Sequence, residues 1–128
     1  MRAVDTNVLV RLVVRDDADQ VRVAEEFVAS GAWVSHLVLA ETMWVLDAVY
    51  ERTPEQIATA VDMLLNHQQI SVQDSDVVAA ATESFRKRPS LGFSDCLVLE
   101  TARKVGNLPL GTFDRELAKA DDVVRLRQ

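Results

Sequence analysis

The stretch Arg2-Ala3-Val4-Asp5-Thr6-Asn7 opens the chain with a short apolar run that ends at an acid. Residues 2–4 are predicted to form a strand, and residues 7–15, whose apolar side chains recur at helical spacing, are predicted to form a helix. A strand that leads at once into a helix is the first half of a βαβ unit. It places the carboxylate of Asp5 at the carboxyl end of the first strand.

The same alternation of short strands and helices continues along the chain. Further strands are predicted over residues 32–35, 70–72, 110–112 and 123–126. Further helices are predicted over residues 17–30, 37–50, 75–85, 93–105 and 115–120, with one more that begins at Thr53-Pro54, and Arg86 to Ser90 is expected to be a basic loop. Strands separated by helices indicate βαβ units, and therefore an α/β fold with a parallel sheet. The linkers are short, so a single domain over residues 1–128 is expected.

Composition limits the classes of protein that fit. The chain has 128 residues, 48% hydrophobic and 27% charged, with Cys96 as its one cysteine, so an intramolecular disulfide is excluded and a cytoplasmic location is expected. No apolar run reaches the length of a membrane span, and Asp5 interrupts any signal peptide. The net charge of −6 argues against a large phosphate-binding surface. It suits a basic protein partner.

Three further acids occupy positions like that of Asp5. Glu41 lies within the apolar helix Leu37–Leu46, Asp95 opens the helix at Phe93, and Asp114 follows the strand-like Leu110–Thr112. In a parallel sheet the carboxyl ends of the strands share one edge, so all four acids are expected to converge on one crevice. Each acid alone has a structural alternative, as a helix cap, a first-turn acid or an acid at the margin of an apolar face. Together they predict a site for Mg²⁺ or Mn²⁺, which prefer oxygen ligands.

Val4-Asp5-Thr6-Asn7, the mid-helix Glu41, Ser94-Asp95-Cys96 and Thr112-Phe113-Asp114 resemble the PIN-domain nucleases. Their order and spacing are most similar to those of the small VapC-type toxins of bacterial toxin–antitoxin pairs, and the resemblance covers nearly the whole chain. It implies a three-layer α/β/α fold with a five-stranded parallel sheet in the order 3-2-1-4-5. It also implies that the metal-binding catalytic acids are Asp5, Glu41, Asp95 and Asp114, with Asn7 and Thr112 as polar helpers and Cys96 in the core.

The expected activity is that of a Mg²⁺- or Mn²⁺-dependent endoribonuclease toxin with a cognate antitoxin, in which a metal-bound water attacks an RNA phosphodiester. One alternative is a non-catalytic RNA- or protein-binding module on the same fold. Another is a metal-dependent phosphatase, which needs a second Asp where this chain has Asn7. A response-regulator domain is disfavoured, because a mid-chain phosphoacceptor Asp and a Lys after a later strand are not evident.

Two surface features have both a simple and a functional interpretation. The region Leu37–Asn66 is more apolar than one helix face requires, which indicates either core or the interface of a homodimer.

The basic groups Arg86-Lys87-Arg88, Arg115 and Lys119 flank Asp95 and Asp114 in sequence. They are either solvated charge or a rim that binds RNA phosphates.

Overall fold

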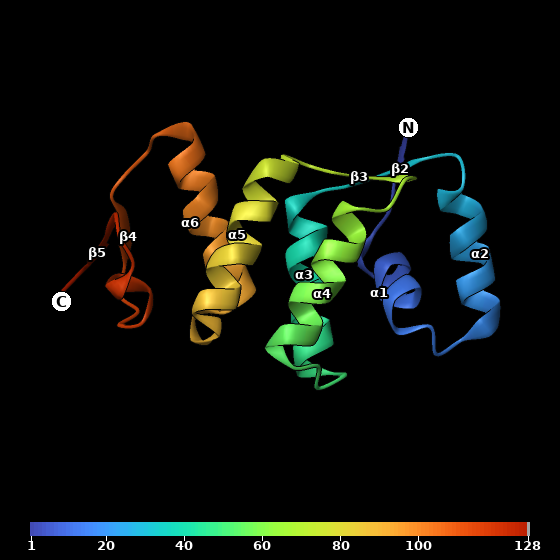
Figure 1. Ribbon diagram of the computed structural model, residues 1–128, viewed down its shortest axis with the longest axis horizontal. Helices are drawn as coiled ribbons and strands as arrows, with labels where there is room; N and C mark the ends of the chain where they lie inside the picture. Colours follow the sequence, from blue (N-terminus) through green and yellow to red (C-terminus); the bar gives the residue numbers. More distant parts are fainter. Residues whose placement is uncertain (128) are drawn as a thin grey trace.

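The computed structural model describes residues 1–127, in which helices and short strands alternate (Figure 1). The strands are β1 (Arg2–Ala3), β2 (Ala32–Val34), β3 (Ile70–Val72), β4 (Leu110–Thr112) and β5 (Val123–Arg125). The α-helices are α1 (Thr6–Val14), α2 (Ala18–Val28), α3 (His36–Ala48), α4 (Pro54–Leu65), α5 (Ser75–Lys87) and α6 (Phe93–Val105). Two 3₁₀ turns, η1 (Pro89–Leu91) and η2 (Leu117–Lys119), flank α6 and β4.

Local capping explains where several helices begin. The side chains of Asp5, Asp17 and Ser35 each accept a hydrogen bond from a backbone N–H in the first turn of the helix that follows. Thr53 and Gln56 form a reciprocal capping box in front of α4. No helix in residues 1–127 is long and apolar enough to cross a membrane.

Two local predictions are corrected. The predicted helix over residues 115–120 is only the 3₁₀ turn η2. The predicted basic loop is largely helical, because Arg86 and Lys87 extend α5 before Pro89 starts a 3₁₀ turn. Proline lacks the backbone N–H that a continuing helix would need, so α5 ends before it.

The strands of residues 1–127 form two parallel sheets, so the predicted five-stranded sheet is wrong for this structure. One sheet has the order β1-β2-β3, with Ala32 placed between Arg2 and Ile70. The other pairs Leu110 of β4 with Val123 of β5. These are the two parts of the predicted order 3-2-1-4-5, but the contact between β1 and β4 is not made.

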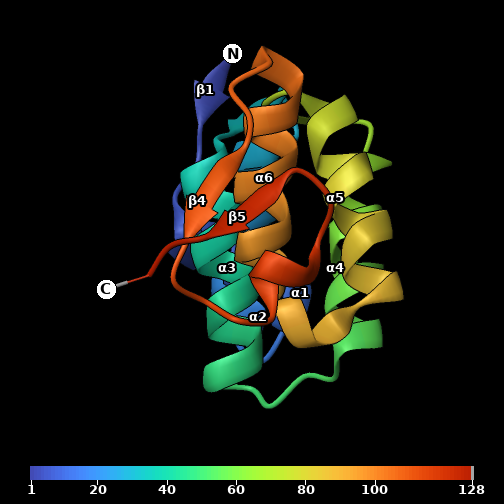
Figure 2. The same ribbon diagram turned by 90° about the vertical axis from the view of Figure 1, so that its left-hand side faces the viewer.

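The second sheet is held on the far side of α6. Arg103 on α6 donates a hydrogen bond of 2.8 Å to the backbone oxygen of Asp121, and its Nε lies 3.6 Å from a carboxylate oxygen of Asp122. Leu117 of η2 is buried in the core. In Figure 1, α6 and α5 stand between β4–β5 and the first sheet, and in Figure 2 the pair β4–β5 lies in front of α6. These contacts keep β4 away from β1.

The core lies among the helices and against one face of the first sheet, and its largest fully buried side chains include Leu9, Val34, Leu39, Met43, Leu46, Val61 and Val78. Phe85 and Phe93 pack edge to face, with ring centroids 6.1 Å apart. On the first sheet, however, the cross-strand neighbours Ala3, Trp33 and Ser71 are all exposed. Parallel sheets are normally covered on both faces. The predicted three-layer arrangement is therefore incomplete within this chain.

The capping box at Thr53 supplies a test of this local structure. Thr53→Ala should lower the free energy of unfolding by about 1 kcal/mol, because it removes the side-chain acceptor for the N–H of Gln56. Thermal unfolding should show a decrease in Tm of about 3–5 °C. The control Thr53→Ser keeps the hydroxyl and should retain most of the stability. Equal losses in the two variants would contradict the capping role.

Candidate functional site

The first pair of predicted site acids is joined through Thr6, and we call this arrangement the Asp5–Glu41 corner. Asp5 is the N-cap of α1, where its Oδ1 accepts from the N–H of Val8 at 3.3 Å. The next residue, Thr6, donates its hydroxyl proton to Oε2 of Glu41 at 2.8 Å. The start of α1 is thereby tied to the middle of α3. Both carboxylates remain exposed to solvent.

Glu41 is exposed, although the helix around it is apolar in sequence. The side chains of Leu37, Glu41, Trp44 and Ala48 recur at helical spacing and form one exposed stripe on α3. Leu37 is 71% and Trp44 is 65% exposed, although both are large and apolar. Glu41 therefore needs no buried counter-charge. It is an acid on an otherwise apolar face that this chain leaves uncovered.

The second pair, Asp95 with Asp114, forms what we call the Asp95–Asp114 corner. Asp95 is partly buried in the first turn of α6, and burial, then the charge of Asp114, raises the pKa of its carboxyl group above 3.8. Asp114 caps η2, since its Oδ1 accepts from the N–H groups of Glu116 at 2.7 Å and Leu117 at 3.2 Å. The carboxylate of Asp95 is thus close enough to that of Asp114 for the second charge to affect its pKa.

The polar helpers predicted with these acids have different surroundings. Thr112 belongs to the second corner, where its Oγ1 accepts from the backbone N–H of Asp114 at 3.0 Å. Asn7 instead lines a groove between α1 and α2, together with Val8, Val23 and Phe27. Thr6, which sequence reasoning passed over, holds Glu41. Only a contact between residues 35 positions apart identifies it.

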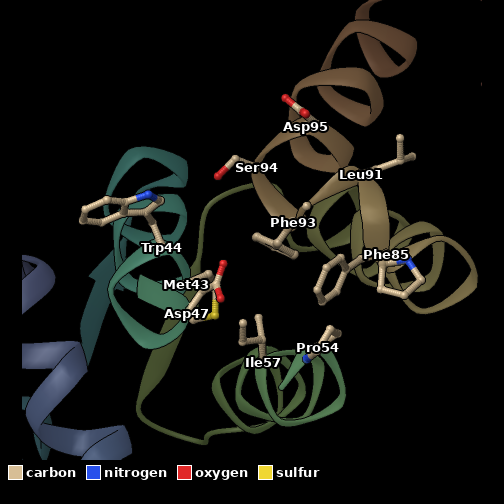
Figure 3. A pocket seen from close by; sticks show the side chains of 12 residues that line it. Met43, Trp44, Asp47, Pro54, Ile57, Phe85, Leu91, Phe93, Ser94 and Asp95 are labelled. Atoms are coloured by element: carbon tan, nitrogen blue, oxygen red, sulfur yellow. The ribbon is translucent and has the colours of Figure 1, made fainter. Parts of the chain in front are cut away.

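A cleft of about 260 Å³ opens beside Asp95, between α3, α4 and the start of α6 (Figure 3). Met43, Ile57 and Phe93 point into it and give it an apolar floor, while Asp95 lies at its margin and points away from that floor. An apolar floor offers no ligand for a cation. The chemistry of the site therefore lies with the carboxylates at the margin and not in the cleft itself.

The four acids do not meet within one chain. In the part of the chain that the structure describes, no group of three or more His, Cys, Asp or Glu side chains could hold a metal ion. Each corner supplies two carboxylates, while the predicted centre requires four. The residues of the single chain therefore do not fit the predicted Mg²⁺ or Mn²⁺ site as they stand.

Of the basic residues that precede Asp95, Arg86 is paired with acids elsewhere and Arg88 lies near the second corner. Arg86 is taken up by acids on α4, with its Nη2 2.6 Å from a carboxylate oxygen of Asp62. Arg88 lies near the corner, because its charge counts among those that lower the pKa of Glu116, behind the larger effect of Lys119. The charge of Arg88 also acts on Cys96, the neighbour of Asp95, so Arg88 lies close to residues on both sides of the corner.

Cys96 is buried beside Asp95, as the resemblance implied. Burial, followed by the charges of Asp95 and Glu100, raises the pKa of its thiol to about 11. A thiol with so high a pKa is rarely ionised at neutral pH and is a poor nucleophile. Cys96 therefore packs in the core and takes no chemical role.

The sequence matches the PIN domain over residues 2–123, which is nearly its full length. The chain belongs to the PIN-domain family. A crystal structure of Mycobacterium tuberculosis VapC20, a toxin that cleaves the sarcin–ricin loop, is similar to this PIN domain with 22% identity and a TM-score of 0.44. The alignment covers 98% of this chain and 100% of that chain. No curated protein matches the sequence.

The Asp95–Asp114 corner of this PIN domain predicts a stability that depends on pH. Since the pKa of Asp95 is raised in the folded state, its ionised form costs stability above that pKa. Asp95→Asn should raise the Tm of the metal-free protein at pH 7. The gain should disappear as the pH falls below 3.8, where Asp95 is protonated in both the folded and the unfolded chain.

Asp76 is the matched control for this measurement. A hydrogen bond from Lys104 lowers the pKa of Asp76, so Asp76→Asn should lower the Tm at pH 7. Thermal scans of the wild type, Asp95→Asn and Asp76→Asn between pH 3 and pH 7 check the expected rise and the expected fall in Tm. A decrease in Tm for Asp95→Asn at pH 7 would contradict the repulsion between Asp95 and Asp114.

Proposed function

We propose that this PIN domain is a VapC-type toxin, an endoribonuclease that hydrolyses RNA phosphodiester bonds. The observation that carries the proposal is the pairing of carboxylates at two corners of a PIN-family chain, Asp5 with Glu41 through Thr6 and Asp95 with Asp114. Each pair includes an acid that directly follows a strand region. In α/β proteins with parallel sheets, ligands bind at the carboxyl ends of the strands.

The catalytic set of this proposal is Asp5, Glu41, Asp95 and Asp114, with Mg²⁺ or Mn²⁺ as the cofactor once the two corners meet. Support comes from the repulsion between Asp95 and Asp114, which a divalent cation would relieve. Oxygen-only ligands of this kind suit these cations. Asn7 and Thr112 are polar helpers in the proposal, and Thr6 joins them as the residue that positions Glu41.

RNA is the proposed substrate in spite of the net charge of −6. Arg88 brings a positive charge to the Asp95–Asp114 corner, where a phosphate group could bind beside the carboxylates. The overall acidity of the chain instead fits a basic protein, and we assign that role to the cognate antitoxin. A cytoplasmic location and a single domain are parts of the same proposal.

A homodimer is proposed from the exposed apolar side chains of the region Leu37–Asn66. Leu37, Trp44, Val49 and Met63 are each at least 60% exposed. Leu37 and Trp44 lie on one exposed stripe of α3, and exposed apolar groups that lie together commonly mark a protein interface. The apolar excess that was read from the sequence is therefore at least partly on the surface and not all in the core.

One rival function has an observation in its favour. A non-catalytic RNA- or protein-binding module on the same fold would not need its acids to meet, and in this single chain they are apart. The two functions differ in whether the protein cleaves RNA and, if it does, whether cleavage depends on the four acids.

Cleavage of total RNA in the presence of Mn²⁺ tests the proposal. Asp5→Asn and Glu41→Gln should each lower the rate about 100-fold or more, because catalysis tolerates little misplacement of reacting groups. Glu26→Gln is the control, since Glu26 is an exposed acid that pairs with Arg22 on the same helix, α2. EDTA should abolish cleavage and excess Mn²⁺ should restore it. Cleavage by Asp5→Asn at the wild-type rate would contradict the assignment.

A further inference from the structure

Within residues 1–127, the edge strands are β1 and β3 in the first sheet and β4 and β5 in the second. Of these, β1 and β4 are the strands that lead toward the acids Asp5 and Asp114. All pairs in both sheets are parallel. An open strand edge presents backbone N–H and C=O groups that readily pair with another strand. The edges at β1 and β4 are therefore suited to continue one another in a single parallel sheet.

The chain also exposes more surface than a compact monomer of its size. A folded monomer of 14.2 kDa exposes about 6,800 Å² on the usual scaling with mass. This chain exposes 7492 Å². The excess of about 700 Å² is close to the ~800 Å² that each partner buries in a standard protein interface.

The exposed apolar groups lie on both halves of the molecule. In the first half they include Trp33 on the open sheet face, with Leu37 and Trp44 on either side of Glu41. In the second half they include Val98 on α6, Phe113 next to Asp114, and Val124 on β5. Each corner of acids thus lies beside apolar surface that lacks a cover in the single chain.

We propose that a second copy of this chain completes the fold and the site by reciprocal exchange. The β4–β5 pair of one copy docks along β1 of its partner, so that the strands run 3-2-1 in one chain and 4-5 in the other. The Asp95–Asp114 corner of each copy then meets the Asp5–Glu41 corner of its partner. A symmetric dimer built in this way holds two composite four-acid sites. This inference rests on the proposed function for its catalytic meaning, but not for its assembly.

A second copy of the chain can pair with β1 and β4 and can bring the two corners of acids together at the same time. An unrelated protein that added one strand to β1 would leave β4 open and would not bring Asp95 and Asp114. A symmetric pair uses the same two surfaces on each copy, which is how closed homodimers form.

The charges make this assembly sensitive to divalent cations. Four carboxylates meet in each composite site, and like charges at close range oppose the contact. A cation that binds only the assembled form favours it by mass action. Mn²⁺ should therefore strengthen the dimer, and EDTA should weaken it.

Mixed dimers of two impaired variants test the exchange. Asp5→Asn and Asp114→Asn chains with different affinity tags are co-expressed, and the mixed dimer is isolated through both tags. In an exchanged dimer, one composite site carries both substitutions and the other carries neither. The mixed dimer should therefore bind half as much Mn²⁺ as the wild-type dimer, measured by calorimetry, and should cleave RNA at about half the wild-type rate.

The control is a mixed dimer of Asp5→Asn with Glu41→Gln. Both substitutions lie in the same corner, so every composite site keeps one defect and neither Mn²⁺ binding nor cleavage should recover. Circular dichroism of each variant establishes that it is folded. Sedimentation of the wild type with Mn²⁺ should give twice the 14.2 kDa mass of one chain.

The outcomes separate this inference from the proposed function. A wild-type monomer that binds Mn²⁺, or a mixed dimer that recovers no more than its control, overturns the exchange even if RNA is cleaved. Recovery of Mn²⁺ binding without any cleavage of RNA supports the exchange and overturns the nuclease function. Recovery of both Mn²⁺ binding and RNA cleavage supports both the exchange and the nuclease function.

Discussion

The open backbone edges of β1 and β4 are the constraint on which the rest of this molecule depends. Parallel strands of two or three residues are stable only as part of a covered sheet, because each has few hydrogen bonds of its own. In this chain Arg103 and Leu117 keep β4–β5 against α6, and β1 is left at an edge. The position of β4 decides whether Asp114 lies near Asp5, and so decides where a site can form.

Electrostatic repulsion between carboxylates opposes a contact between β1 and β4. Burial, and then the charge of Asp114, raises the pKa of Asp95, so two of the four acids already interact at one corner. Bringing Asp5 and Glu41 to the same place would add to this repulsion. In the proposed dimer, backbone pairing and apolar burial would favour the contact between β1 and β4, while the carboxylates would oppose it until a cation is present. Such a contact would link metal binding, assembly and activity in one equilibrium.

Local signals predicted much of the fold. Asp5 and Thr53 are capping residues that indicate where helices begin. The alternation of apolar runs predicts the order of the elements. The neighbours within each sheet follow the predicted order. The capping alternative raised for Asp5 and Asp114 is also present in the structure, although capping does not compete with a role in a site.

Long-range contacts explain what the sequence could not reveal. The hydrogen bond from Arg103 to Asp121, which anchors β4–β5, joins residues 18 positions apart and leaves no periodic signal. The helix around Glu41 is apolar on nearly every side, so its pattern did not show which face would be exposed. The same holds for Thr6, whose importance depends on meeting Glu41 from another helix.

Hydrogen exchange of the backbone at β1 and β4 tests the central claim most directly. If a second copy supplies the missing strand pair, the amides of Ala3 and Gly111, whose neighbours Val4 and Leu110 already donate within the chain, should exchange more slowly as the protein concentration rises through the micromolar range with Mn²⁺ present. Protection at β2, which is paired within the chain, should rise less. Protection at β1 and β4 that does not change with concentration would contradict an intermolecular sheet.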